Sequence, residues 1–403
     1  MTRRLLVVSS DFGIPLWGTK GASVHLRAMV RAFAGAGLEV GVAVRGVGEP
    51  HAGESLGAGT RTFVLPDSPR PKDRTFTPER MNDDLSARLV EIGSTFRFEA
   101  IYERAALWSL APLEFARRAG MPHLVEVNAP LSIESARWRD LPHARAARAA
   151  EERLAQESSR LFPVSSPIAN FLVALGADRG RIVTLPNAVD EAFLAVGRER
   201  MTLLAAHRPA HRPFTIGFVG SLKPWHGIET LLAAYRILEQ RTPNVRLLVV
   251  GDGPLAARVR EEAARGAGIE WIGAVPHGTV APLLTTMDVA VAPYDESGDG
   301  YFSPLKVLEY QAAGVPVVAS GGRGVEDLVV DGESGILVPS GDAPRLSEAI
   351  TRLRDDGALA LRVASRAFVR VSSRTWARNA EKVIASWTAC ETDVAAAERQ
   401  AAR

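Results

Sequence analysis

Apolar residues in the first half of the chain alternate between short continuous runs and stripes of helical period. The run Leu5–Ser10 predicts a buried strand, and the stripe that follows, spaced i, i+3, i+4 and i+7, consists of Leu26, Met29, Val30 and Phe33. Similar runs predict strands at residues 38–44, 100–102, 123–127, 162–165 and 182–186, and similar stripes predict helices at 85–96, 144–161 and 167–175. Residues 46–73 are rich in Gly and Pro and have no period, so an irregular excursion is expected there.

The alternation stops near the middle of the chain and then restarts. Residues 196–213 lack a hydrophobic period and contain two His-Arg-Pro units, which is typical of an interdomain linker. Beyond them, strands are predicted at 215–219, 245–250, 269–272, 289–292, 315–319 and 335–338, with helices at 228–235, 255–264, 280–286, 305–312 and from 343 onward. A β–α alternation that occurs twice predicts an α/β protein of two doubly wound, Rossmann-like domains, residues 1–195 and 214–374, that face each other across a cleft.

The composition is that of a globular protein and does not call for a polyanionic partner. With 403 residues, 46% of them hydrophobic, the chain can bury two substantial cores. Its 48 Lys and Arg side chains nearly balance 46 Asp and Glu, so the net charge of +2 gives no reason to expect a nucleic acid. The arginines of residues 137–153 are expected on a solvated helix face, with peripheral contact to an anionic membrane surface as the alternative.

Three further features bear on location and on metal binding. No apolar run approaches the about 20 residues of a membrane span, and the amino-terminal run is too short for a signal peptide, so the cytoplasm is the expected compartment. Cys390 is the only cysteine, which excludes an intrachain disulfide. Pro209 separates His207 from His211 and breaks the i, i+4 arrangement of a helical metal site, so neither a metal nor a cofactor is expected.

The first strand-to-helix loop excludes one common nucleotide motif and leaves another use open. Gly13, Gly18, Thr19 and Lys20 almost match a P-loop, but Thr precedes Lys where the motif requires Lys before Ser or Thr. NTP hydrolysis is therefore rejected, and the lack of a G-x-G-x-x-G after any strand disfavours a nicotinamide oxidoreductase. Gly18 and Gly21 would instead let the backbone approach a diphosphate beside Lys20; the alternative is a plain strand–helix connection.

Residues 298–320 combine a loop rich in Gly, Asp and Ser with a short helix and a buried strand. Ser303 has the chemistry of an N-cap, and Pro304 suits the first helical position. A helix start with free N–H groups and Lys306 in its first turn suits an anion such as phosphate. Glu309 lies about 9 Å inside the helix, at ~1.5 Å per residue, which is the span from a nucleotide diphosphate to its ribose hydroxyls. The sequence thus predicts a nucleotide-sugar site, against the alternative of an ordinary capped surface helix.

Polar side chains also follow two predicted strands of the first half, at the strand ends where ligands of such folds bind. Arg104 follows the strand at 100–102, while Glu126, Asn128 and Glu134 come at or beyond the end of the strand at 123–127. These four side chains are candidates for contact with an acceptor or a sugar ring. For each of them the alternative is a hydrogen bond that orients a loop.

Several segments, taken in order, resemble the retaining glycosyltransferases of family 4, which have the GT-B fold. In the second half they are GFVGSLKPWHG (217–227), VVGDGP (249–254), IGAVPHGTVAPLLTTMDVAVAPY (272–294) and SPLKVLEYQAAGVPVVAS (303–320). The others are KGASVHLRAMVRAFAGAGLEV (20–40), VTLPNAVDEAFL (183–194) and SSRTWARNAEKVIASWTAC (372–390). The resemblance covers nearly the whole chain and is nearer to a subgroup with an SPLK…EY pattern.

The resemblance implies transfer of a sugar from a nucleotide-diphosphate sugar, UDP favoured, to a hydroxyl acceptor with retention of anomeric configuration. It implies that the backbone at Gly21 meets the donor diphosphate, that Val275 lies at the base and that Glu309 binds the ribose. The residues that would lie by the phosphates are Ser303, Leu305 and Lys306. It further implies a closing helix, residues 375–403, that crosses back to the N-terminal domain.

Three charged positions of the family pattern are altered in this chain. Ser221 stands where the family usually has Arg, His226 where it usually has Lys, and Tyr301 where it usually has an acidic residue. Lys306 and Lys223 are expected to restore positive charge at the phosphates. Lys306 is accordingly the first candidate for a catalytic role.

Asn128 is the second catalytic candidate, because it stands near a family His that contacts the sugar. An amide can donate or accept a hydrogen bond but cannot act as a base at neutral pH. No side chain is recognisable as a covalent nucleophile, so retention rests on the resemblance alone. The alternatives are a sugar-nucleotide epimerase or another GT-B enzyme such as a glycan phosphorylase, and a non-catalytic nucleotide-binding scaffold.

Overall fold

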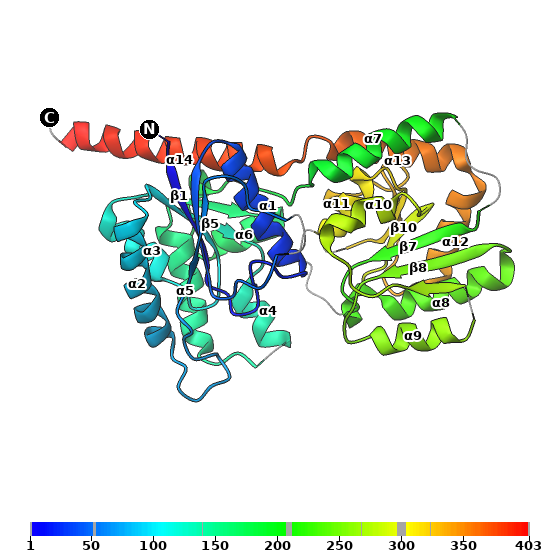
Figure 1. The fold of residues 1–403 in the computed structure, drawn as a ribbon, viewed down its shortest axis with the longest axis horizontal. Coiled ribbons are helices and arrows are strands. Elements are labelled where there is room, and N and C mark those ends of the chain that lie inside the picture. The colour runs from blue at the N-terminus through cyan, green and yellow to red at the C-terminus, as the bar shows by residue number, and fades with distance from the viewer. Residues whose placement is uncertain are drawn as a thin grey trace. The chain divides into compact units, whose positions relative to one another are not determined.

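The computed structural model describes residues 2–50, 54–138, 140–206, 212–266, 268–295, 304–322 and 324–401. The chain divides into an N-terminal domain, Met1–Pro186 with Trp376–Arg403, and a C-terminal domain, Asn187–Thr375 (Figure 1). Each domain is built on one six-stranded sheet with helices on both of its faces. The chain therefore has the doubly wound α/β architecture that the alternation of apolar runs and helical stripes predicts.

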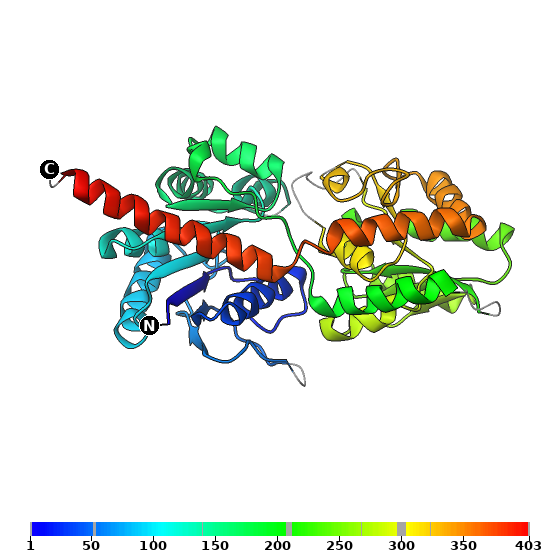
Figure 2. The same ribbon diagram turned by 90° about the horizontal axis from the view of Figure 1, so that it is seen from above.

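The N-terminal sheet has the spatial order β3-β2-β1-β4-β5-β6, with parallel pairing throughout. Its strands are β1 (Arg4–Ser9), β2 (Glu39–Val44), β3 (Thr60–Val64), β4 (Ala100–Arg104), β5 (His123–Val127) and β6 (Arg160–Pro163). Its helices are α1 (Gly21–Gly35), α2 (Pro78–Thr95), α3 (Ala111–Ala119), α4 (Leu131–Trp138), α5 (Ala144–Glu157), α6 (Ser166–Ala174) and α14 (Trp376–Ala401). The long helix α14 lies beside α1 (Figure 2), and the ring of its Trp376 packs on that of His25 in α1, with 4.7 Å between the centroids. Val383 and Trp387 are also buried.

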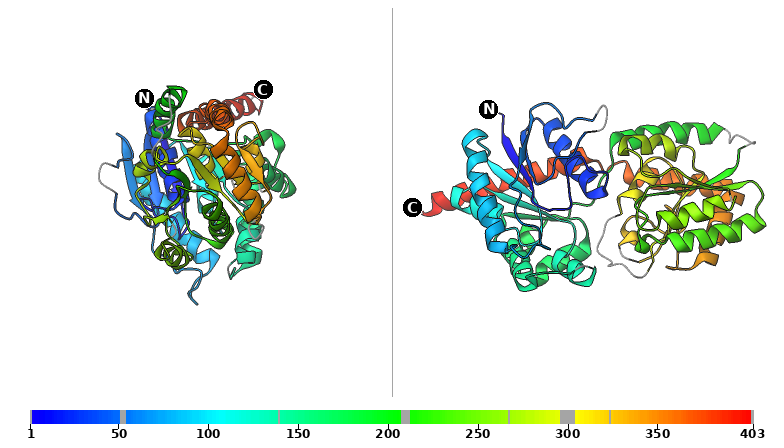
Figure 3. Two further views of the ribbon diagram at one scale, coloured as in Figure 1. Left: turned by 90° about the vertical axis from the view of Figure 1, so that its right-hand side faces the viewer. Right: turned by 60° about the horizontal axis from the view of Figure 1, so that its bottom comes forward.

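The C-terminal sheet has the order β12-β11-β10-β7-β8-β9, again with parallel pairing throughout. Figure 3 shows this sheet with helices packed around it. Its strands are β7 (Phe214–Val219), β8 (Val245–Val250), β9 (Ile269–Trp271), β10 (Val289–Ala292), β11 (Val317–Ser320) and β12 (Ile336–Val338). Its helices are α7 (Glu191–Ala206), α8 (Ile228–Arg241), α9 (Ala256–Ala264), α10 (Val280–Leu284), α11 (Leu305–Ala312), α12 (Ala343–Asp355) and α13 (Gly357–Val371).

Both sheets have the strand order 3-2-1-4-5-6 when each is counted from its own first strand. In this order, the strands that follow the first strand are added toward one edge of the sheet, and the strands that follow the fourth strand are added toward the other edge. Ligands of doubly wound sheets bind beyond the carboxyl ends of these two strands, where the order reverses. In the C-terminal domain these strands are β7 and β10, so a ligand is expected to bind at the loops that follow them.

The alternation of side chains along each strand gives the C-terminal sheet two separate cores. In β8, Val249 belongs to the cluster under α8 and α12, whereas Val250 belongs to the cluster under α10 and α11. A sheet buried on both faces has strands that are apolar at nearly every position. This explains why continuous apolar runs were sufficient to predict β7, β8, β10 and β11.

Two predictions on the N-terminal sheet are wrong. Strand β3 lies within residues 46–73, where irregular structure was expected; it is an edge strand with mostly exposed side chains, so its sequence has no apolar run. Residues 182–186 do not form a strand. Ile182 makes an isolated bridge to Leu161, and the Val183 N–H donates to the carbonyl oxygen of Leu161 beside β6.

The structure differs from the predicted linker at 196–213, because α7 extends to Ala206 and is packed on the C-terminal domain. Arg200 is buried in α7 and donates to the carbonyl oxygens of Thr285 (3.0 Å) and Met287 (2.8 Å). A helix that buries an arginine and a glycine, Gly197, shows no clean apolar stripe, which is why the pattern did not reveal it. Residues 207–211, with the two histidines weighed for a metal site, lie outside the described residues.

Gly197→Ala should destabilise the C-terminal domain by about 1–3 kcal/mol through overpacking. A Cβ at this position would lie 1.9 Å from the carbonyl oxygen of Ala312 and 2.7 Å from the Phe368 ring, so α7 would have to move away from α11. Urea denaturation measures the free energy of unfolding. Gly357→Ala in α13 is the matched control, because a Cβ there has no neighbouring atom within 4 Å. An unchanged stability of Gly197→Ala would contradict the packing of α7.

Candidate active site

A buried tyrosine fixes α11 against the carboxyl end of β7. The Tyr310 hydroxyl donates to the carbonyl oxygen of Val219 (3.2 Å) and accepts from the N–H of the same residue (2.7 Å). Val219 is the last residue of β7, and Lys306 precedes Tyr310 by four residues, so both side chains extend from one face of α11. The first turn of α11 is thereby held beside the loop that follows β7.

Glycines in two neighbouring turns allow this close approach. Gly220 (φ +142°) and Gly251 (φ +137°) adopt backbone conformations that favour glycine. A Cβ on Gly251 would lie 1.9 Å from the carbonyl oxygen of Gly220, and a Cβ on Gly220 would lie 2.7 Å from Nζ of Lys306. The N–H of Leu222 donates to the carbonyl oxygen of Asp252 (2.9 Å), so the turn after β8 stabilises the loop after β7.

The ammonium group of Lys306 is buried and has no hydrogen-bond partner among the residues that the structure describes. Its Nζ lies 4.2 Å from the centroid of the Phe218 ring and 5.4 Å from that of Tyr294. Burial lowers the pKa of Lys306 to about 7, and the carboxylate of Glu309 acts in the opposite direction. Aromatic ring faces stabilise a cation less strongly than a neighbouring carboxylate would. The ammonium of Lys306 is therefore suited to bind an anion.

His226 ends a 3₁₀ turn, η2 (Pro224–His226), in the loop after β7. Its Nδ1 lies 2.5 Å from the carbonyl oxygen of Ser221 and must therefore carry the proton that it donates. Burial, together with the charges of Lys306 and Lys223, lowers the pKa of His226 to about 3, although the bond to Ser221 acts the other way. His226 is thus neutral at physiological pH, and Nε2 is its acceptor atom.

Glu309 lies one turn further along α11 and is 6% exposed. Its Oε1 is 2.6 Å from Nε2 of His277, the first residue of the 3₁₀ turn η3 (His277–Thr279). Val275, two residues before His277, is partly buried and packs against the core under α10 and α11. His277 was not among the predicted site residues; the only signal for it was its place in the segment 272–294 of the resemblance.

The helix α11 begins one residue later than predicted. Pro304 occupies the N-cap and Leu305 is the first helical residue. Proline has no side-chain acceptor, and none of the described side chains caps the helix. The N–H of Val307 donates to the carbonyl oxygen of Pro304 (3.1 Å), so the N–H groups of Leu305 and Lys306 are the ones that have no partner among the described residues. Ser303, the predicted N-cap, and Tyr301 lie outside the described residues.

In the N-terminal domain the loop after β1 leads to an open backbone position at the start of α1. Lys20 is exposed and occupies the N-cap, and Gly21 is the first helical residue, with no side-chain cap from the described residues. A Cβ on Gly21 would meet no atom within 4 Å. The loop itself is stabilised by Arg27, a buried side chain that donates to the carbonyl oxygen of Gly18 (2.7 Å).

Glu126 is the centre of a buried hydrogen-bond network in the same domain. Its Oε2 contacts the Tyr102 hydroxyl (2.5 Å) and Nε2 of His25 (2.8 Å), and its Oε1 accepts from Arg104 (2.8 Å) and from Asn128 (2.5 Å). Burial by itself would raise the pKa of Glu126, but His25, Arg104 and Asn128 outweigh it and hold the pKa well below its ordinary value. The carboxylate is therefore ionised and its oxygens are already occupied.

This network determines how the predicted acceptor-side residues are placed. Glu126 is 1% exposed, so it orients Arg104 and Asn128 and does not itself reach a ligand. Glu134 lies elsewhere, in the first turn of α4, and is partly exposed. His25 and Tyr102 were not predicted, because their connection to Glu126 joins three elements that are far apart in the sequence.

The arginine-rich segment lies mainly on α5 and is ion-paired. Arg148 contacts Glu152 (3.0 Å), and Arg153 contacts both Glu114 (2.8 Å) and Glu157 (2.9 Å). Across the described ranges, no helix is long and apolar enough to cross a membrane. Nor do three or more His, Cys, Asp or Glu side chains gather there in a way that could hold a metal ion.

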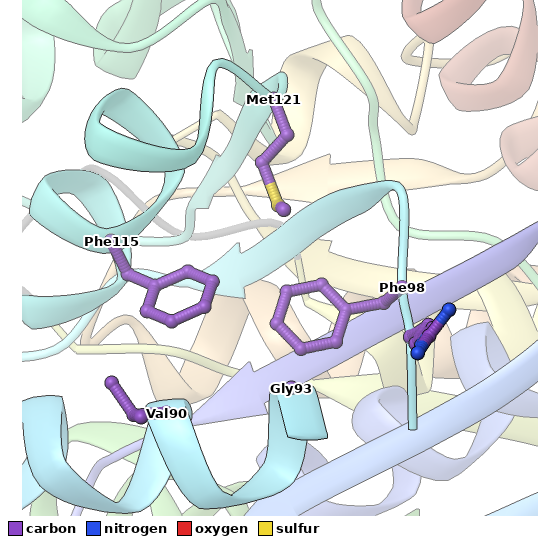
Figure 4. Close-up of a pocket in the computed structure, with 6 residues that line it drawn as sticks. Val90, Gly93, Phe98, Phe115 and Met121 are labelled. Atoms are coloured by element: carbon purple, nitrogen blue, oxygen red, sulfur yellow. The ribbon is translucent and has the colours of Figure 1, made fainter. Parts of the chain in front are cut away.

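An apolar groove of about 270 Å³ lies on the N-terminal domain, between α2 and α3 (Figure 4). It is lined by Val90, Gly93, Arg97, Phe98, Phe115 and Met121. Phe98 and Met121 come just before β4 and β5, at the amino ends of these strands. The groove therefore lies at the edge of the sheet opposite to the one where ligands of this architecture bind.

Similarity to known proteins extends over both domains. The D-inositol 3-phosphate glycosyltransferase of Paenarthrobacter aurescens (strain TC1) is 28% identical over 385 residues, which cover 91% of this chain and 92% of that relative. The phosphatidyl-myo-inositol mannosyltransferase of Mycolicibacterium smegmatis is 34% identical over 205 residues, 50% of each chain.

Solved structures share the fold. The sucrose-phosphate synthase of Thermosynechococcus elongatus superimposes with a TM-score of 0.75 at 22% identity and covers 97% of this chain and 100% of its own. Anabaena HepE in complex with UDP-glucose gives a TM-score of 0.69 at 18% identity, with 96% of this chain and 99% of HepE covered.

Two family models match the chain, one in each domain. The model described as "Glycosyl transferase 4-like domain" matches residues 20–188, and the model described as "Glycosyl transferases group 1" matches residues 213–356. With the full-length relative and the shared fold, these matches show that the chain belongs to the GT4-type glycosyltransferases of group 1, which have the GT-B fold.

Proposed function

We propose that this glycosyltransferase moves a sugar from a nucleotide-diphosphate sugar, with UDP as the favoured nucleotide, to a hydroxyl acceptor and retains the anomeric configuration. One observation carries the proposal. The start of α11, which no described side chain caps, the buried ammonium of Lys306 and the carboxylate of Glu309 occur together at the carboxyl ends of β7 and β10. A nucleoside diphosphate needs a binding group of each kind, because its phosphates are anions and its ribose carries hydroxyl donors.

The leaving group of such a transfer is a diphosphate on which negative charge grows as the sugar departs. The N–H groups at the start of α11 and the ammonium of Lys306 are fixed before the reaction begins, so they stabilise that charge without reorganisation. The chemistry therefore needs no metal ion in this proposal.

The altered positions Ser221 and His226 concentrate the positive charge of the site on Lys306. His226 is neutral and bonded to the Ser221 carbonyl, so it can contribute a hydrogen bond but no charge. Lys223 provides a second ammonium, whose Nζ lies 4.8 Å from the centroid of the Trp225 ring. Val275 would meet the nucleoside base, because it precedes the turn whose His277 contacts Glu309.

Similar proteins support the donor class. HepE, which shares the fold, has been crystallised with UDP and with UDP-glucose. The names of the relatives specify different acceptors, an inositol phosphate and a phosphatidylinositol, so the proposal for this chain is confined to a hydroxyl acceptor. On the acceptor side, the proposed contacts are Arg104 and Asn128 as oriented by Glu126, together with Glu134.

Product analysis separates the proposal from its two alternatives. The protein is incubated with UDP-, GDP- and ADP-sugars, each with and without a panel of hydroxyl acceptors, and the products are identified by mass spectrometry and NMR. A glycosylated acceptor of unchanged anomeric configuration supports the proposal. Conversion of the donor alone into an isomeric nucleotide sugar would indicate an epimerase, and tight nucleotide binding without turnover would indicate a scaffold.

Glu309→Ala should weaken nucleotide binding by about 1–3 kcal/mol, because hydrogen bonds from the ribose hydroxyls to a carboxylate are lost. Isothermal titration calorimetry with UDP measures the change. Glu134→Ala serves as the control, since Glu134 lies in the other domain and its loss should leave UDP affinity unchanged. Native affinity in Glu309→Ala would contradict the ribose role.

Lys306→Met should lower kcat more than it weakens binding of the intact donor. Methionine keeps the length of the side chain and removes the charge, which matters most when negative charge develops in the transition state. Steady-state kinetics give kcat, and equilibrium titration gives the Kd of the donor. Equal losses in both would show that Lys306 contributes only to ground-state binding.

Nucleotide affinity should fall as the pH rises above about 7. The pKa of Lys306 is lowered to about 7 in the free protein, so its neutral form predominates above that pH and a diphosphate must bind the protonated minority. The Kd of UDP, measured from pH 6.5 to 9, should rise by up to about tenfold per pH unit. Lys306→Arg keeps its charge over this range and should flatten the profile; an equally steep profile would assign the titration to another group.

A further inference from the structure

The carboxylate of Glu309 is held by a side chain from outside α11. Nε2 of His277 lies 2.6 Å from Oε1 of Glu309, and the two side chains are mostly buried, at 17% and 8% exposure. An ionised carboxylate can only accept hydrogen bonds, so His277 is the donor. No other described side chain donates a hydrogen bond to Glu309, so within the described ranges Oε2 and one further lone pair on Oε1 can accept from two hydroxyl groups of a ligand.

His277 is itself fixed from three sides. It begins η3, in which both the N–H and the hydroxyl of Thr279 bond to the carbonyl oxygen of Pro276. Its ring packs on that of Phe193 in α7, with 5.4 Å between the centroids. Its Nδ1 lies 3.9 Å from the Asp190 carboxylate. These contacts fix the imidazole as a hydrogen-bond donor to the carboxylate of Glu309.

We propose that His277 is a positioning residue that holds the Glu309 carboxylate in the orientation needed for the ribose hydroxyls, and so sets the preference for ribose over 2′-deoxyribose nucleotides. This rests on the proposed function, since it assigns a partner to the ribose-binding group. The physical reason is preorganisation: a carboxylate that is oriented before the ligand arrives loses less rotamer freedom on binding. The diphosphate contacts at Lys306 and the start of α11 are independent of His277.

The ratio of the Kd of 2′-deoxy-UDP to the Kd of UDP tests the proposal, because the two ligands share the base and the diphosphate. The variants are His277→Phe, which keeps the ring against Phe193 and removes the donor, and His277→Gln, which places an amide N–H where Nε2 was. His277→Phe should reduce the ratio by about 10- to 150-fold, the usual effect of losing a hydrogen bond to a charged group. It should leave the Kd of 2′-deoxy-UDP within about threefold, while His277→Gln should restore most of the native ratio.

Three further measurements complete the experiment. Thr279→Ala is the matched control, because Thr279 is exposed in the same turn and its hydroxyl bonds to the carbonyl oxygen of Pro276; it should keep the native ratio. Glu309→Gln should by itself abolish the preference for UDP over 2′-deoxy-UDP. Adding His277→Phe to Glu309→Gln should reduce the ratio of the two Kd values no further. Thermal denaturation of each variant shows that the fold is retained.

The outcomes distinguish this inference from the function on which it rests. If His277→Phe keeps the native ratio of the two Kd values while Glu309→Gln abolishes the preference for UDP, the role of His277 is overturned and the proposed function stays intact. A lost ratio in His277→Gln as well as in His277→Phe would also overturn it, because the donor N–H would then not be what matters. Failure of the native protein to bind UDP, GDP or ADP would overturn both.

Discussion

The pair of hydrogen bonds between Tyr310 and the backbone of Val219 is the interaction on which the candidate site depends. It fastens a side chain of α11 to the last residue of β7, and four residues earlier the same helix face carries Lys306. Gly220 follows Val219 directly and leaves the space that the ammonium of Lys306 occupies. One buried tyrosine thus brings a helix start, a cation and a glycine turn together at the point where the strand order of the sheet reverses.

The charge of the site follows from burial more than from the number of basic residues. His226 replaces a family lysine, and burial beside Lys306 keeps it neutral. The ammonium of Lys306 lies against aromatic faces, and the carboxylate of Glu309 only partly offsets the effect of burial on its pKa. In the proposed donor site, one desolvated ammonium beside a helix start would therefore take the place of the two basic side chains that Ser221 and His226 replace.

The buried carboxylates of the two domains differ in how many hydrogen bonds they accept. Glu126 of the N-terminal domain receives four hydrogen bonds and has become a structural centre that orients its neighbours. Glu309 of the C-terminal domain accepts from one of the described side chains, His277, and so has acceptor capacity for a ligand within the described part of the chain. A buried carboxylate whose lone pairs are filled by the protein stabilises the fold, whereas one that is held but not saturated is suited to recognition.

The sequence by itself determined the doubly wound α/β architecture and the segment that carries Lys306 and Glu309, because strands buried on both faces are apolar at nearly every position and helix signals are local. It did not reveal β3 or α7, since an edge strand has no apolar run and a helix that buries Gly197 and Arg200 has no clean stripe. Only the tertiary structure decided which polar groups meet. Glu126 collects donors from α1, β4 and the end of β5, and His277 reaches Glu309 across 32 positions of the chain. Hydrogen bonds of this kind depend on how elements pack, and no local pattern of residues encodes that.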